Sequence, residues 1–167
     1  MTYTFKFLAT IFTASCLIFV SASAQESDIT PVDFGDPETL SIETDDATHN
    51  FLVEIADSDE EQSRGMMYRD SVSPDTGMLF EYADNTVVSI WMKNTGVPLD
   101  IIFIRTNGKI LKIEHSATPY SLRSIVSEGR VSGVLELAGG RSMELGIMPG
   151  DIVRHEYFGN LDDSAEN

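Results

Sequence analysis

A chain of 167 residues is long enough for one ordinary domain and short for two. Its 27 acidic residues outnumber 11 basic ones, and the resulting formal charge of −16 disfavours general binding to nucleic acid or to an anionic membrane surface. The single cysteine excludes an internal disulfide bond.

The first 24 residues have the three regions of a secretory signal peptide. Lys6 precedes the uncharged and mostly apolar run Phe7–Val20, and Ser21–Ala24 ends in a small A-x-A cleavage site. An uncleaved anchor is the alternative, but about 20 apolar residues are needed to span a bilayer as a helix. We therefore expect an exported protein, periplasmic or secreted, that is cleaved after Ala24 and is not stably inserted in a membrane afterwards.

The rest of the chain divides into one domain between two acidic ends. Residues 25–37 are polar and are interrupted by Pro31, Gly35 and Pro37, which is typical of a flexible leader. Residues 159–167 form a short acidic tail. We expect a single globular domain over residues 38–158, without internal repeats.

Short segments rich in Val, Ile and aromatic residues dominate this domain and predict β-strands. Asn107-Gly108 lies between two of them and is a strong hairpin signal. Ile101–Ile104 is apolar on both faces, as expected of a strand that is covered on both sides. The predicted strands are Thr39–Glu43, Phe51–Ala56, Val87–Met92, Asp100–Arg105, Gly108–His115, Val131–Leu137 and Asp151–Tyr157.

One helix is predicted from Ser58 to about Tyr68. Ser58 and Glu61 have the spacing of a capping box, in which each residue bonds the backbone of the other. Gly65 inside this helix would cost about 1 kcal/mol relative to alanine. We therefore expect Gly65 either to pack closely on the sheet or to let a ligand approach the backbone.

The predicted elements together indicate the fold class. A loop is expected over Ser71–Gly77 and a second, short helical turn over Gly140–Leu145. Seven strands with one or two helices make the chain mainly β, in other words a β-rich α+β fold. We expect a small barrel-like or sandwich arrangement of the sheet with one or two short covering helices.

Several motifs along the domain resemble those of one protein family. The most specific is the run Trp91-Met92-Lys93-Asn94-Thr95, followed by Pro98-Leu99-Asp100-Ile101. The others are Arg64–Arg69, Gly77–Phe80, Val134–Gly140 and Gly150–Val153. Over nearly all of Phe51–Tyr157 the chain is similar to the bacterial and archaeal family known as domain of unknown function 192. The resemblance implies a compact β-rich fold, often in exported or membrane-associated proteins, and no established biochemical activity.

Polar and aromatic residues at strand and loop ends are the candidates for a binding site. An indole beside an ammonium and an amide, as at Trp91, Lys93 and Asn94, can stack on and hydrogen-bond a polar ligand such as a sugar, although a single tryptophan is more often part of a core. Arg64 either forms a helix-surface ion pair with Glu60 or presents its planar guanidinium to a carboxylate or phosphate.

Two acidic residues complete the candidate site. Asp100 either caps the Gly96–Leu99 turn or faces the same loop as Asn94. Glu136 shares a strand face with Val134. Its carboxylate is solvated, or forms a structural ion pair with Arg64 or Lys93, or is the acid of a site.

These observations favour a non-enzymatic binding or accessory module for a small polar ligand, a glycan or an envelope protein. Two alternatives stay open. One is a hydrolase that acts on envelope carbohydrate through Asp100 and Glu136, provided that the carboxyl groups lie about 5–9 Å apart. The other is a purely structural interaction module.

We expect no cofactor and no metal site. The three histidines lie far apart in the sequence and have no zinc-binding spacing. The methionines that follow residue 24 contain no M-x-x-M cluster for Cu(I), so we expect them to fill the core. Neither the identity of the ligand nor the oligomeric state follows from the sequence.

Overall fold

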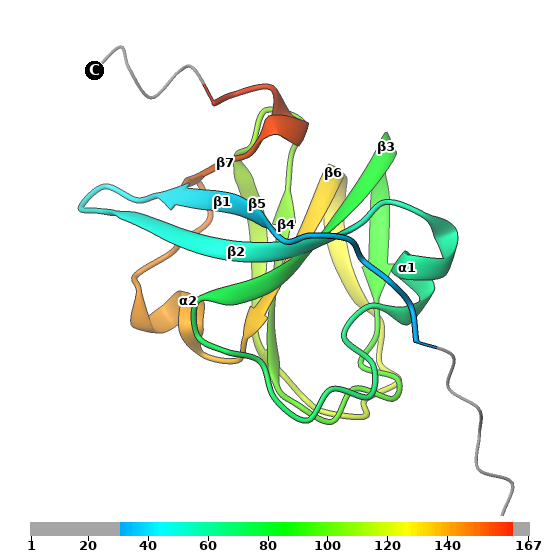
Figure 1. Cartoon of the computed structure of the whole chain (residues 1–167). Helices are drawn as coiled ribbons and strands as arrows, with labels where there is room; N and C mark the ends of the chain where they lie inside the picture. The colour runs from blue at the N-terminus through cyan, green and yellow to red at the C-terminus, as the bar shows by residue number, and fades with distance from the viewer. Residues whose placement is uncertain (1–30, 162–167) are drawn as a thin grey trace, which may run out of the picture. The chain divides into compact units, whose positions relative to one another are not determined.

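Seven strands form one sheet in a computed structural model that describes residues 31–161. Their order across the sheet is β5-β4-β6-β3-β2-β1-β7, and the sheet curls into a half-barrel (Figure 1). The strands are β1 (Glu38–Glu43), β2 (Thr48–Ala56), β3 (Thr76–Ile90), β4 (Leu99–Ile104), β5 (Ile110–Ala117), β6 (Ile125–Ala138) and β7 (Ile152–Arg154). The mainly β fold class is confirmed. The predicted signal peptide lies outside the described residues.

The pairing of the strands places β6 between β3 and β4. β6 pairs antiparallel with β3 on one side and with β4 on the other. β2 and β3 are parallel, whereas β1 is antiparallel to both β2 and β7. The predicted hairpin joins β4 to β5, and the Arg105 amide closes its turn by donating to the Lys109 carbonyl oxygen, 3.0 Å away.

Side chains that alternate along the strands form two apolar cores, one on each face of the sheet. The first core contains Leu79, Ile102 and Leu135. The second contains Phe80 and Val134. Because β4 supplies side chains to both cores, its predicted burial on both faces is confirmed: Ile101, Ile102, Phe103 and Ile104 are each 0% exposed.

The first helix, α1 (Asp59–Arg64), is shorter than the predicted one. Its capping box is confirmed, because the Ser58 hydroxyl accepts from the Glu61 amide at 3.3 Å and the Glu61 carboxylate accepts from the Ser58 amide at 2.9 Å. Gly65 is not inside the helix as predicted but ends it, with φ +47° and ψ −138°. A Cβ atom on Gly65 would lie 3.0 Å from the Phe80 ring, so the predicted close packing on the sheet is present.

Two further short elements follow β6. The helical turn α2 (Arg141–Glu144) falls within the predicted range 140–145. β7 is shorter than predicted, because the chain turns into the 3-10 helix η1 (Glu156–Phe158). Within residues 31–161 no helix is long and apolar enough to cross a membrane.

Two further sequence predictions need correction. Residues 78–86 were not predicted as strand, yet β3 runs unbroken from Thr76 to Ile90. At Gly77 this strand passes so close to β6 that a side chain does not fit. A Cβ atom there would be 2.6 Å from the Glu136 carbonyl oxygen. The methionines do not all fill the core. Met66, Met78 and Met92 are buried in the second core, but Met143 and Met148 are 66% and 59% exposed.

Candidate functional site

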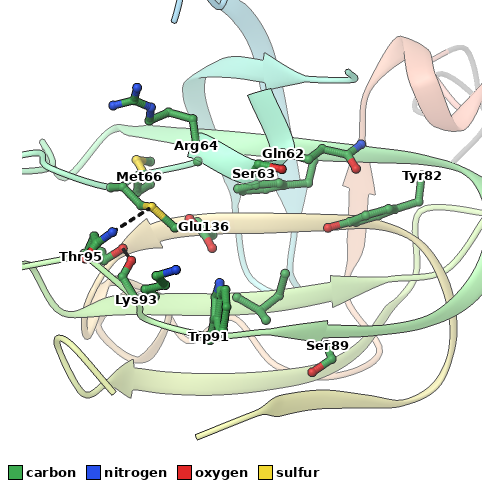
Figure 2. Close-up of a pocket in the computed structure, with 15 residues that line it drawn as sticks. Gln62, Ser63, Arg64, Met66, Tyr82, Ser89, Trp91, Lys93, Thr95 and Glu136 are labelled. Atoms are coloured by element: carbon green, nitrogen blue, oxygen red, sulfur yellow. Dashed lines mark hydrogen bonds between the residues drawn. The ribbon is translucent and has the colours of Figure 1, made fainter. Parts of the chain in front are cut away.

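A pocket of about 410 Å³ brings together five of the six predicted site residues. We call it the Trp91 pocket. It is lined by Arg64, Trp91, Lys93, Asn94 and Glu136, whereas Asp100 does not reach it. Further lining residues are Gln62, Met66, Phe80, Tyr82 and Thr95 (Figure 2).

Three parts of the chain form the Trp91 pocket. Residues 62–67 come from α1 and the loop after it, residues 89–95 come from the end of β3 and the following loop, and Glu136 comes from β6. Hydrogen bonds hold the two loops together: the Tyr68 amide donates to the Asn94 carbonyl oxygen at 2.9 Å, and the Asn94 side-chain amide donates to the Tyr68 hydroxyl at 2.8 Å. Asn94 has φ +55°, a conformation that asparagine tolerates better than most residues. Asn94 therefore joins the two loops, and its role in binding stays a prediction.

Two cations in the lining of the Trp91 pocket lie over aromatic rings. Trp91 is 51% exposed, so it is not the core residue that a single tryptophan usually is. The Lys93 ammonium lies over its indole, 5.0 Å from the ring centroid. The Arg64 guanidinium lies 5.5 Å from the centroid of the Tyr68 ring. The alternative pairing of Arg64 with Glu60 stays a prediction.

Glu136 is the acidic group of the Trp91 pocket and is only 4% exposed. It stands opposite Met78 on β3 and Ile101 on β4, and it therefore faces the second core together with Val134, as predicted. Burial among these apolar side chains raises the pKa of Glu136 to about 8, although nearby Arg69 acts in the opposite direction. At pH 7 the carboxyl group is therefore mostly protonated and can donate a hydrogen bond.

Tyr82 lies in the same apolar surroundings as Glu136. Burial raises the pKa of its hydroxyl to about 12, and the neighbouring Glu136 contributes in the same direction. In the view of Figure 2, Glu136 lies between Arg64 on one side and the Trp91–Lys93 pair on the other.

Asp100 belongs to a different part of the molecule. It stands opposite Leu137 on β6, next to Glu136, so strand alternation places the two carboxylates on opposite faces of the sheet. Its buried oxygens accept four hydrogen bonds, from the amides of Ser116 and Gly140 at 2.8 Å and from the amide and hydroxyl of Ser142 at 2.7 and 2.6 Å. The predictions that Asp100 shares a site with Glu136 and that it caps the Gly96–Leu99 turn are both wrong: it joins β5 to the start of α2.

Gln62, Tyr82 and Thr95 line the Trp91 pocket but were not singled out in the sequence. The alternation of Met78, Phe80 and Tyr82 would have indicated a strand with these three side chains on one face. Gln62 carries no such signal. Its side-chain amide donates to the carbonyl oxygens of Glu81 at 2.7 Å and Ala56 at 3.3 Å, contacts that only the folded chain reveals.

Comparison with known proteins identifies similar chains. The family model for domain of unknown function 192, described as an uncharacterized ACR, matches residues 40–155. A crystal structure from Sinorhizobium meliloti 1021, described as a candidate transcription regulator, is 37% identical with a TM-score of 0.73, over 76% of this chain and 98% of that one. A protein of unknown function from Novosphingobium aromaticivorans DSM 12444 is 33% identical with a TM-score of 0.70, over 71% of this chain and 85% of that one. The search of curated proteins gave no match.

Proposed function

Because the chain belongs to the domain of unknown function 192 family, whose description assigns no activity, we propose a function from the Trp91 pocket itself: it binds a small polar ligand. The observation that carries this proposal is the convergence of an exposed indole, two cations and a buried acid on one pocket of about 410 Å³. Small-molecule sites have volumes of this order and combine apolar walls with a few polar groups.

The exposure of Trp91 favours binding over a purely structural role. A structural module gains stability by burying its large aromatic side chains, but about half of Trp91 remains in contact with solvent. The surroundings of Glu136 also favour binding. Glu136 is buried beside the second core and forms no ion pair with Lys93, because the Lys93 ammonium lies over the Trp91 ring.

The geometry gives no support to the hydrolase alternative in its predicted form. Its two carboxylates, Asp100 and Glu136, lie on opposite faces of the sheet, so they cannot flank one glycosidic bond. The rhizobial structure is described as a candidate transcription regulator, but direct binding to nucleic acid is disfavoured for this chain by its net charge of −16.

Thermal unfolding tests the proposal. The protein, expressed from its full-length sequence, would be unfolded with a panel of neutral sugars, amino acids, small anions and metal ions. A ligand at a hundred times its Kd stabilises by about 2.7 kcal/mol, which raises the Tm of a domain of this size by several degrees.

Trp91→Ala should abolish the shift that a binding compound produces. Leu122→Ala is the matched control, because Leu122 is 69% exposed but does not line the Trp91 pocket. No shift with any compound, or a shift that Trp91→Ala leaves unchanged, would show that the pocket does not bind a small ligand.

A further inference from the structure

The Trp91 pocket is electrically polar, with a buried acid and an exposed ammonium in its lining. Glu136 lies within the second core, whereas Lys93 is exposed and holds its ammonium 5.0 Å from the Trp91 centroid. Arg64 lines the same pocket. This separation of charge narrows the ligand class, and the inference drawn from it rests on the proposed binding function.

The Glu136 carboxyl group is open to a ligand that donates hydrogen bonds. Among the described residues, none is found to donate a hydrogen bond to Glu136, and its pKa responds only to burial and to Arg69. Arg69 already forms an ion pair with Glu54, 2.6 Å away. Because Glu136 lines the Trp91 pocket, a ligand bound there can supply the donors that the protein does not.

Lys93 is the cation that a ligand carboxylate can reach. It sits on an aromatic face and is exposed, and among the described residues no acidic side chain is found to pair with it, so a carboxylate can approach its ammonium freely. A neutral sugar would use neither this cation nor the charge that Glu136 can acquire.

We propose that the Trp91 pocket binds a small zwitterion, with a ligand ammonium at Glu136 and a ligand carboxylate at Lys93. An ammonium supplies three donors and pairs strongly with a carboxylate in a site of low dielectric constant. The volume of about 410 Å³ suits a molecule of the size of an amino acid or a dipeptide.

Proton release follows from this arrangement. The Glu136 carboxyl group, mostly protonated at pH 7, would pass its proton to the buffer when it pairs with the ligand ammonium, which keeps its own protons. The other ionisable groups around it are Tyr82 on β3, Lys93 and Arg64 in the lining of the pocket, and Arg69 after α1. Burial raises the pKa of the Tyr82 hydroxyl to about 12, so this neighbour stays protonated at pH 7 and the released proton comes from Glu136.

The experiment compares matched sets of probes at pH 7 by thermal unfolding and calorimetry. The first set contains free amino acids and dipeptides. The second contains their N-acetyl derivatives, which lack the ammonium, the third contains their carboxamides, which lack the carboxylate, and the fourth contains neutral monosaccharides. We expect Tm shifts of several degrees with the first set alone, and the release of close to one proton when titrations in two buffers are compared.

Variants of Glu136 and Lys93 test which end of the ligand each residue binds. Glu136→Gln should weaken zwitterion binding about tenfold or more and abolish proton release, and Lys93→Ala should weaken it about tenfold. Glu156→Gln and Lys109→Ala are exposed controls outside the pocket and should change neither. If Glu136→Gln does not fold, Lys93→Ala and the proton release of the unmodified protein still decide.

The outcomes separate the two proposals. Binding of sugars or of N-acetyl derivatives but not of zwitterions would overturn the ligand class and leave the binding function standing. Zwitterion binding without proton release, or with unchanged affinity in Lys93→Ala, would overturn the assignment of the two charges. An absence of binding in all four sets would overturn the zwitterion and the small-ligand function together.

Discussion

At the scale of single residues, Glu136 couples the Trp91 pocket to the pH dependence of folding. Its pKa is about 8 in the folded protein and 4.5 as the ordinary value. Between these pH values the folded protein holds a proton that the unfolded chain has released, so the free energy of unfolding falls as pH rises and levels off above about 8. Glu81, whose pKa burial raises to about 7, acts in the same direction.

Glu136→Gln isolates this contribution because glutamine does not ionise. We expect the free energy of unfolding of the variant, measured relative to the unmodified protein, to increase from pH 5 to pH 8 with a slope approaching about 1.4 kcal/mol per pH unit. Urea unfolding at four pH values across this range measures the difference. A difference that does not change with pH would mean that Glu136 ionises as freely in the folded protein as in the unfolded chain.

Asp100 acts on stability rather than on binding. Asp100→Asn replaces an acceptor oxygen by an amide that must face donors from Ser116, Gly140 or Ser142. We expect a loss of about 2–4 kcal/mol in the free energy of unfolding. Asp84→Asn is the exposed control and should change stability by less than about 0.5 kcal/mol. Equal effects of the two changes in urea unfolding would contradict this role.

Gly65 is required by both its backbone and its surroundings. With φ +47° and ψ −138° it occupies a conformation that residues with a Cβ atom rarely adopt, and that atom would meet the Phe80 ring at 3.0 Å. Gly65→Ala should therefore destabilise the protein by about 2 kcal/mol or more. Gly159→Ala is a matched control, since Gly159 also has a positive φ, +62°, but has open space around it. We expect a loss of only about 1 kcal/mol there, and thermal unfolding of both variants tests the difference.

At the scale of elements, the capping box at its N-terminus stabilises α1. A helix of six residues is too short to be stable alone, so its capping box and its contacts with the sheet must hold it. Ser58→Ala removes the hydroxyl that accepts from the Glu61 amide and should cost about 1 kcal/mol. Ser63→Ala on the same helix is the control and should be near neutral. Urea unfolding that finds equal losses would show that the cap adds nothing specific.

Sequence patterns predicted the elements whose signals are local. The capping box at Ser58 and the hairpin at Asn107-Gly108 each need only neighbouring residues, and both are present in the structure. The first half of β3 was missed because Gly77, Asp84 and Asn85 are residues typical of turns. Pairing with both β2 and β6, together with a bulge after Glu81, keeps this segment extended, and such distant partners leave no mark in the local sequence.

The candidate site was predictable to a similar extent. Residue chemistry at strand and loop ends identified five of the residues that line the Trp91 pocket. The prediction that Asp100 lies in the same site was wrong because a shift of one residue along a strand reverses the face of a side chain. The position of Asp100 relative to Glu136 depends on the pairing of β4 with β6, which the sequence does not show. Tyr82 was missed together with the strand that carries it.

At the scale of the whole molecule, the acidic surface and the cationic side of the Trp91 pocket have opposite effects on a ligand. A net charge of −16 repels small anions at long range, whereas the Lys93 ammonium attracts them at short range. Salt screens the long-range repulsion over about 10 Å at 0.1 M. A zwitterion carries no net charge, so its approach is not opposed by the acidic surface, and this fits the ligand class inferred from the pocket.

The first 24 residues bear on the compartment in which the protein works. A signal peptide ending at Ala24 predicts that the full-length chain, expressed in a bacterium, reaches the periplasm or the medium with Gln25 as its first residue. Cell fractionation and intact mass measurement test this. Ala24→Phe, which puts a large side chain at the cleavage site, should leave the chain unprocessed and in the membrane fraction.

If the unmodified chain retains Met1 in that fraction, the segment is an anchor, and if it retains Met1 in the cytoplasm, export itself is excluded. A pocket for zwitterions would then meet the metabolites of the cytoplasm instead of compounds outside the inner membrane, which would change the pool in which its ligand should be sought.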